Sequence, residues 1–303
     1  MVNKVAIGEI RKYFREIKNI YLRGDYTEWS YRTPFENFIE GLNPDYSLVQ
    51  EPKRTTGLGA PDFKAFYKSR KVGFIETKDL NENLDRILET EQLRKYIESI
   101  DNLILTNYLQ FILIRKGRKI YDCSLLTLHN LEKGRLTVSE DKISMFISLI
   151  SEFFDYKLPT ITSAEELAFE LSKRAKLLKE LALKQLSEDL KKVENGDTPS
   201  SIYDFYQGVK ELIKDIEVED CADAYAQTVT YGLFLAKKNC PNTLDRRIAS
   251  YYIPKNVGII KRIFLNISGE EFPPNISWIV DDIIDILNAS KLDDMGCTPK
   301  SRQ

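Results

Sequence analysis

Two acidic residues and a lysine in the first third of the chain have types and spacings that suit the hydrolysis of a phosphodiester. Asp62 directly follows Pro61, and Glu76 and Lys78 come later, separated by one residue. Such hydrolysis needs a nucleophilic water, neutralisation of charge on the phosphate, and help for the leaving oxygen. A Mg²⁺ or Mn²⁺ ion held by hard oxygen ligands supplies all three when water positions stay open. We expect Asp62 and Glu76 to be metal ligands, with the backbone carbonyl of Thr77 as a third.

Lys78 adds a cation to the two carboxylates. It can orient or help to deprotonate the attacking water, and it can offset charge on the phosphate. Burial would lower its pKa, whereas the neighbouring acids would raise it. An isolated Glu-x-Lys on a strand is more often a solvated ion pair, and a Pro-Asp dipeptide is more often a turn. The prediction of a site therefore depends on the two patterns occurring together.

The residues around this group predict a β-hairpin. The stretches 63–67 and 72–78 favour strands, and polar residues separate them. Antiparallel pairing across a tight turn would place Phe63 roughly opposite Glu76. Asp62 would then lie at the open end of the hairpin, beside the Glu-x-Lys pair.

The second strand of this hairpin ends in charged residues. Because side chains alternate between the two faces of a strand, Glu76 and Lys78 should share a face with Val72. Phe74 has the same parity. The packed side of the strand would then end in charge, which costs stability unless the charges are paired or bind a metal ion.

Glu36 is a candidate third carboxylate, for catalysis and for metal binding. Thr33 and Pro34 open a helix, as a capping residue followed by proline at the first position. Glu36 lies off the apolar stripe of this helix. The alternative is an ordinary solvated glutamate, but its position just ahead of the hairpin makes Glu36 a candidate.

The loop ahead of Asp62 is small, polar and basic. Lys53, Arg54, Thr55 and Thr56 would contact DNA phosphates through charges, hydroxyls and backbone N–H groups. The alternative is an ordinary loop without a ligand. Its place beside the carboxylates favours the phosphate-binding interpretation.

A helix predicted over residues 81–99 carries Gln92 and Tyr96, which are four residues apart and share a face. Basic residues beyond the loop add candidate phosphate contacts, although a solvated surface is the equally weighted alternative. These residues are Lys64, Lys68, Arg70, Lys71, Arg115, Lys116, Arg118 and Lys119. Contacts to phosphates would carry no sequence preference.

The predicted elements indicate two domains and a tail. The first, over residues 1–158, is a mixed α/β domain rather than an alternating βαβ array. The second, over 159–290, is an all-α array, and 291–303 should be unstructured. The first domain's expected helices are 3–22, one from 33, and 81–99, and its strands are 47–52, the hairpin, 103–106, 111–114 and 120–123. Helices are expected from about 142 and over 164–192, 201–215, 220–238, 255–267 and 276–289.

The composition of the chain excludes several classes of binding site and of cellular location. The chain has 303 residues and a formal net charge of −2, so bulk charge does not predict binding to nucleic acid. The single histidine, His129, excludes a multi-histidine metal site. The cysteines lie far apart without a C-x-x-C spacing, and no apolar segment of membrane length occurs. We therefore expect a cytoplasmic protein without disulfides, zinc or membrane contact.

The motifs Pro61-Asp62, Glu76-x-Lys78 and Gln92-x-x-x-Tyr96 resemble those of the PD-(D/E)XK nuclease superfamily, in its Mrr-like branch with a Q-x-x-x-Y helix. The resemblance implies a restriction-endonuclease-like fold in which Asp62 and Glu76 bind Mg²⁺ and Lys78 is catalytic. It also implies that Gln92, together with Tyr96, faces the active site and the DNA backbone. Glu36 matches the acidic residue on the early helix of such sites by order alone.

The second half of the chain is similar to the helical connector of type IIG and related single-polypeptide restriction–modification enzymes. Residues 222–236, Tyr252-Ile253-Pro254 and 272–284 carry this similarity. The glycine-rich cofactor loop and the N-P-P-Y-type motif of a methyltransferase are missing, so S-adenosylmethionine binding is not expected. The resemblance implies a Mg²⁺-dependent endonuclease acting on double-stranded DNA. Methyltransferase and target-recognition domains would belong to a longer chain or a partner, with transient dimerisation on DNA.

Two other functions remain open from the sequence. One is a repair or junction-processing nuclease of the same fold, although the long helical half argues against it. The other is a DNA-binding or subunit-bridging module without catalysis, in which Lys78→Ala would change no activity.

Overall fold

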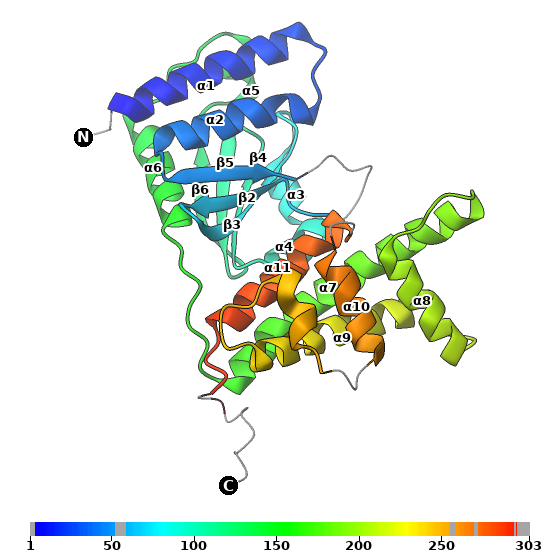
Figure 1. Cartoon of the computed structure of the whole chain (residues 1–303). Coiled ribbons are helices and arrows are strands. Elements are labelled where there is room, and N and C mark those ends of the chain that lie inside the picture. The colour runs from blue at the N-terminus through cyan, green and yellow to red at the C-terminus, as the bar shows by residue number, and fades with distance from the viewer. Residues whose placement is uncertain (1–3, 52–58, 255–257, 270–271, 294, 296–303) are drawn as a thin grey trace. The chain divides into compact units, whose positions relative to one another are not determined.

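The computed structural model describes residues 4–51, 59–254, 258–269, 272–293 and 295. Its contacts divide the chain into two compact units. Among the described residues, the N-terminal unit ends at Lys157, and the C-terminal unit contains Gly59 and Ala60 together with the residues from Leu158 on. Figure 1 shows a sheet with helices around it in the N-terminal unit and helices in the C-terminal unit. The expected fold class, a mixed α/β domain followed by an all-α domain, is confirmed.

The N-terminal unit is built on a six-stranded sheet whose strands follow chain order, β1-β2-β3-β4-β5-β6. Neighbouring strands pair antiparallel except β3 and β4, which run parallel because two helices, α3 and α4, connect them. The strands are β1 (Tyr46–Gln50), β2 (Phe63–Tyr67), β3 (Arg70–Thr77), β4 (Asn102–Thr106), β5 (Gln110–Arg115) and β6 (Arg118–Ser124).

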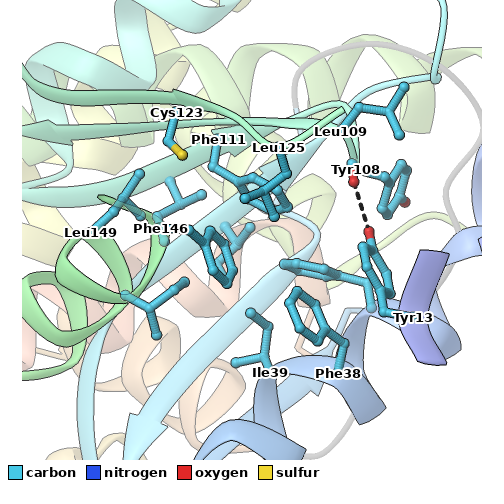
Figure 2. Packing of buried hydrophobic residues seen from close by; sticks show 14 of the residues in the cluster. Tyr13, Phe38, Ile39, Tyr108, Leu109, Phe111, Cys123, Leu125, Phe146 and Leu149 are labelled. Atoms are coloured by element: carbon cyan, nitrogen blue, oxygen red, sulfur yellow. Dashed lines mark hydrogen bonds between the residues drawn. The ribbon is translucent and has the colours of Figure 1, made fainter. Parts of the chain in front are cut away.

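One face of the sheet packs against α1 (Lys4–Arg23), α2 (Arg32–Leu42) and α6 (Glu140–Phe154), with η1 (Glu28–Tyr31) just ahead of α2. The short helix α5 (Leu128–Glu132) precedes α6. Aromatic rings fill this core: Phe38 stacks on Phe146 with ring centroids 5.4 Å apart. The Tyr13 hydroxyl donates to the Tyr108 carbonyl at 2.9 Å, which ties α1 to the turn after β4 (Figure 2).

The segment predicted as one helix over 81–99 forms two, α3 (Leu84–Leu88) and α4 (Glu91–Ser99). The single-helix prediction was wrong because two polar residues cap separate helices. The Asn83 side chain accepts from two N–H groups at the start of α3, and the Thr90 hydroxyl accepts from Leu93 N–H at the start of α4. The apolar periodicity of the segment did not show this break.

The β2–β3 hairpin forms as predicted, with a register one residue from the expected one. Phe63 pairs with Ile75, so Asp62 is level with Glu76 at the open end. The difference arises at the turn, because Tyr67 already pairs with Arg70 and only Lys68 and Ser69 lie between the strands. A bulge at Val72 inserts one residue into the second strand and moves Phe63 back towards its expected partner by one position. Val72 consequently joins the core cluster that contains Ile75, and the predicted common face of positions 72 and 74 is wrong.

The C-terminal unit consists mainly of helices. They are α7 (Ala164–Glu194), α8 (Ser201–Leu212), α9 (Val218–Asn239), η2 (Arg246–Tyr252), α10 (Gly258–Ser268) and α11 (Pro274–Ala289). Among the described residues, none of the helices combines the length and the apolar composition that crossing a membrane requires.

A charged group is buried between α7 and α11. The Arg174 side chain is 2% exposed, and its Nε donates to Asp282 Oδ2 at 2.7 Å. Its Nη1 donates to Glu170 Oε2 at 2.6 Å. Removal of a guanidinium from water is costly, so this position depends on both carboxylates.

Candidate active site

Glu76 and Lys78 form an ion pair at the carboxyl end of β3. Lys78 Nζ donates to Glu76 Oε1 at 2.6 Å, and the Glu76 residue is only 5% exposed. The backbone N–H of Lys78 donates to the Thr106 carbonyl at 2.8 Å, which continues the pairing of β3 with β4. The strand pairing therefore fixes the position from which both side chains project.

The pair borders a cavity of about 220 Å³. Its charged lining consists of four carboxylates and a single ammonium group, so it attracts cations and repels anions. Residues of α3 and α4 and of the segments flanking them also line the cavity. The lining residues are Glu28, Glu76, Lys78, Asp79, Glu82, Ile87, Thr90, Gln92 and Leu93.

Asp62 lies level with Glu76, and its two oxygens have different partners. Thr77 donates to Oδ2 through its backbone N–H at 2.7 Å and its hydroxyl at 2.6 Å. Oδ1 accepts a hydrogen bond from Nη2 of Arg32. Thr77 and Glu76 are adjacent on a strand and point to opposite faces. Thr77 therefore holds Asp62 at the end of β3, where the Asp62 charge acts on both Glu76 and Lys78.

Arg32 is a buried cation at the start of α2. It is 3% exposed, and its guanidinium lies 3.8 Å from the centroid of the Trp29 ring. Its Nη2 also lies 3.8 Å from Glu28 Oε1. Its Nε is buried and has no hydrogen-bond partner. One guanidinium therefore lies within ion-pair distance of two carboxylates, from Glu28 and from Asp62.

The positions of these groups change their pKa values. Burial, with a smaller effect of the Asp62 charge, raises the pKa of Glu76 to about 7, despite the opposite effect of Lys78. Burial and the Asp62 charge also raise the pKa of Glu28. For Lys78, burial lowers the pKa, but the charge and hydrogen bond of Glu76 prevail and raise it above its usual value. Lys78 is therefore an ammonium group in this site.

Three of the predicted site residues come together, and a fourth joins them. Asp62, Glu76 and Lys78 lie at the end of β3, and Gln92 lines the cavity from α4. Glu36 lies near β1 instead, where its carboxylate accepts a hydrogen bond from the Gln50 side chain.

The predicted DNA contacts include Tyr96 and four residues of the basic loop ahead of Asp62. Tyr96 is 1% exposed, so its ring packs inside the unit and does not offer a surface to DNA. The predicted phosphate rim of Lys53, Arg54, Thr55 and Thr56 lies outside the described residues.

Several of the other basic candidates pair with carboxylates of the same unit. The N–O distances are 2.7 Å for Lys64–Glu51, 3.5 Å for Lys68–Asp45, 2.5 Å for Arg115–Glu152 and 2.6 Å for Lys119–Asp122. Arg70 donates to the Tyr156 carbonyl. These pairs reduce the positive charge that the residues could present to a phosphate.

Sequence reasoning missed Glu28, Arg32, Asp79 and Glu82. The one local signal was an acid and an arginine four residues apart, Glu28 and Arg32, directly ahead of the predicted helix. The Tyr108 hydroxyl, which donates to the Glu28 carbonyl at 3.1 Å, helps to fix this segment at the cavity. That contact joins positions far apart in the chain and has no local signature.

The donor atoms of the site can be compared with those that Mg²⁺ or Mn²⁺ prefers. Asp62 and Glu76 offer hard oxygen ligands, and Arg32 and Lys78 now supply the positive charge that these carboxylates need. No group of three His, Cys, Asp or Glu side chains among the described residues could hold a metal ion. Mg²⁺ is often bound by one or two carboxylates with water and substrate oxygens, so two acids fit that pattern.

Comparisons with known proteins give limited information. No protein-family model matches the chain, and no curated protein matches it. A solved structure that it resembles is the cryo-electron microscopy structure of a DrdV–DNA complex, with 16% sequence identity and a TM-score of 0.38. The match covers 93% of this chain and 26% of the other, so the chain spans about a quarter of that protein. A TM-score this low carries no functional assignment.

Proposed function

We propose that this chain is a divalent-metal-dependent nuclease that hydrolyses phosphodiester bonds of double-stranded DNA. The observation that carries the proposal is the buried Glu76–Lys78 pair beside Asp62, at a cavity walled by carboxylates. The resemblance of these motifs to the PD-(D/E)XK superfamily supports the same chemistry. Asp62, Glu76 and the Thr77 carbonyl would hold Mg²⁺ or Mn²⁺.

The charges favour a cation as the first ligand. Asp62 and the four carboxylates that line the cavity carry five negative charges when ionised, and Arg32 and Lys78 compensate two of them. A bound divalent ion would compensate two more. Buried charges are stable only when they are compensated in this way.

The metal would polarise the phosphate and lower the pKa of a bound water. Lys78 would act as an ammonium group that donates a hydrogen bond to the attacking water or to a phosphate oxygen. Because its pKa is raised, proton abstraction from water by Lys78 is disfavoured in the metal-free site. Gln92, which lines the same cavity from α4, would orient the water or the DNA backbone.

The biological setting that we propose is a restriction–modification system. The C-terminal unit resembles the helical connector of single-polypeptide enzymes in sequence, and it would join the nuclease to methyltransferase and target-recognition domains. DNA contacts at Lys53, Arg54, Thr55 and Thr56 would be made to phosphates and would carry no sequence information. Double-strand cleavage would use two such sites through transient dimerisation on DNA.

Nicking of supercoiled plasmid tests the proposal. The purified chain should convert supercoiled DNA to open circles in Mg²⁺ or Mn²⁺, and EDTA should abolish the conversion. Binding of DNA without nicking, under all metal conditions, would instead support a DNA-binding or bridging module. Preference for branched over linear duplexes would favour a junction-processing nuclease.

The identity of the third acid gives a separate prediction. Glu28 borders the cavity, whereas Glu36 pairs with Gln50, so Glu28→Gln should lower the nicking rate about 10²-fold and Glu36→Gln less than threefold. Initial rates at saturating Mg²⁺ measure both variants. The reverse order would restore Glu36, the acid expected from chain order, as the third member of the site.

A further inference from the structure

The partners of Asp62 suggest a role for Arg32 that depends on the proposed metal-dependent function. Thr77 occupies Oδ2 of Asp62 with two hydrogen bonds, and Arg32 occupies Oδ1. Arg32 therefore binds Oδ1, the Asp62 oxygen that accepts no hydrogen bond from Thr77. A divalent ion at this carboxylate would compete with the guanidinium for the same atom.

We propose that Arg32 is a positioning residue that exchanges carboxylates when the metal binds. In the metal-free site it neutralises Asp62. When a divalent ion takes Oδ1 of Asp62, the guanidinium transfers to Glu28. The exchange keeps a buried charge paired in both states, which avoids the large cost of leaving it alone.

Glu28, the second carboxylate partner, already lies close to the Arg32 guanidinium. The same atom, Nη2 of Arg32, that donates to Asp62 lies 3.8 Å from Glu28 Oε1. A hydrogen bond between a guanidinium and a carboxylate is about 2.8 Å long, so a movement of about 1 Å would form it. The transfer therefore needs no rearrangement of α2.

The surroundings of the guanidinium permit such a movement. The guanidinium carbon Cζ lies over the Trp29 ring, 3.8 Å from the ring centroid, and a cation–π contact of this kind tolerates a shift parallel to the ring. Its Nε has no hydrogen-bond partner although it is buried. The metal-free position thus leaves one donor unsatisfied, and a shifted position can use that donor.

Trp29 provides a direct test in the unmodified chain. The protein has two tryptophans, and the second, Trp278, is fully buried in the C-terminal unit and supplies a constant background. Titration with Mg²⁺ in the absence of DNA should produce a saturable change in Trp29 emission, with the midpoint that calorimetry gives for metal binding. Trp29→Phe should remove the change and keep the heat of binding.

The outcomes separate this inference from the proposed function. Calorimetric binding of Mg²⁺ or Mn²⁺ without any change in Trp29 emission would overturn the exchange and leave the nuclease proposal standing. Absence of metal binding in calorimetry would overturn both.

Substitution of Arg32 supplies a second measurement. Arg32→Met should bind Mn²⁺ about tenfold more tightly than the wild type, because Asp62 then starts without a competing cation. Arg32→Lys keeps the charge and should stay within about threefold of the wild type. Equal or weaker Mn²⁺ binding by folded Arg32→Met would contradict the proposal. If Arg32→Met does not fold, the Trp29 titration of the wild type decides alone.

Discussion

Glu76→Gln should reduce Mg²⁺-dependent nicking of plasmid DNA by a factor of about 10³ or more. Glutamine keeps the shape of the side chain but offers a neutral, weaker metal ligand. It also removes the charge that pairs with Lys78 at 2.6 Å and raises the pKa of that lysine. Both the metal site and the orientation of the ammonium group would then be lost together.

This loss should occur without loss of the fold. Burial raises the pKa of Glu76 to about 7. At pH 8 the carboxylate is ionised, and because its charge is buried in the folded state, this ionisation costs more free energy there than in the unfolded chain. Glutamine removes this cost, which offsets the lost partner of Lys78. We expect the melting temperature at pH 8 to stay within a few degrees of the wild-type value, as circular dichroism would show.

The matched control for Glu76→Gln is Glu152→Gln. Glu152 pairs with Arg115 on the exposed side of the same unit, and its side chain is 47% exposed. Its substitution should leave the nicking rate within about twofold of the wild type. Equal rates for wild type and Glu76→Gln would remove Glu76 from the active site and would end the nuclease proposal.

Asp282→Ala should lower the free energy of unfolding of the helical unit by about 3–5 kcal/mol. The change takes away the carboxylate that accepts from Nε of Arg174 at 2.7 Å, and Arg174 is only 2% exposed. The guanidinium then keeps its pair with Glu170 but loses compensation in a place that water does not reach. Urea denaturation followed by circular dichroism measures the difference.

The neighbouring acid provides the control for Asp282→Ala. Asp281 pairs with Arg246 at 3.0 Å, but its side chain is 40% exposed, so Asp281→Ala should cost about 1 kcal/mol or less. The double variant Arg174→Met with Asp282→Leu should recover much of the lost stability, because an apolar pair needs no compensation. Similar effects of Asp281→Ala and Asp282→Ala would show that burial does not govern these ion pairs.

The fold was predictable where the pattern was local. Alternating and apolar runs located the strands, and the polar break at residues 68–71 located the hairpin turn. The bulge at Val72 was not predictable, because an inserted residue leaves no mark on a strand whose later residues are all buried. The cap at Thr90 was visible as a residue type, but the apolar periodicity around it favoured one continuous helix.

The same distinction between local patterns and long-range contacts decided which site residues could be predicted from the sequence. Asp62, Glu76 and Lys78 were found because a hairpin brings residues close in the chain together. Glu28 and Arg32 reach the site only through contacts with residues 30 or more positions away, such as Arg32 with Asp62 and Thr77 with Glu28. Such proximity comes from the packing of η1 and α2 on the sheet, which no local spacing encodes.

The two tyrosine hydroxyl bonds of the N-terminal unit have a consequence for the order of folding during synthesis. Tyr13 reaches the Tyr108 carbonyl across 95 positions, and Tyr108 reaches the Glu28 carbonyl across 80. Contacts of such sequence separation form late, because the entropy of closing a long loop must be overcome first. A growing chain that has not yet released Tyr108 from the ribosome therefore lacks a fixed acidic wall. The cavity is completed only after β4 and the turn that carries Tyr108 have been synthesised.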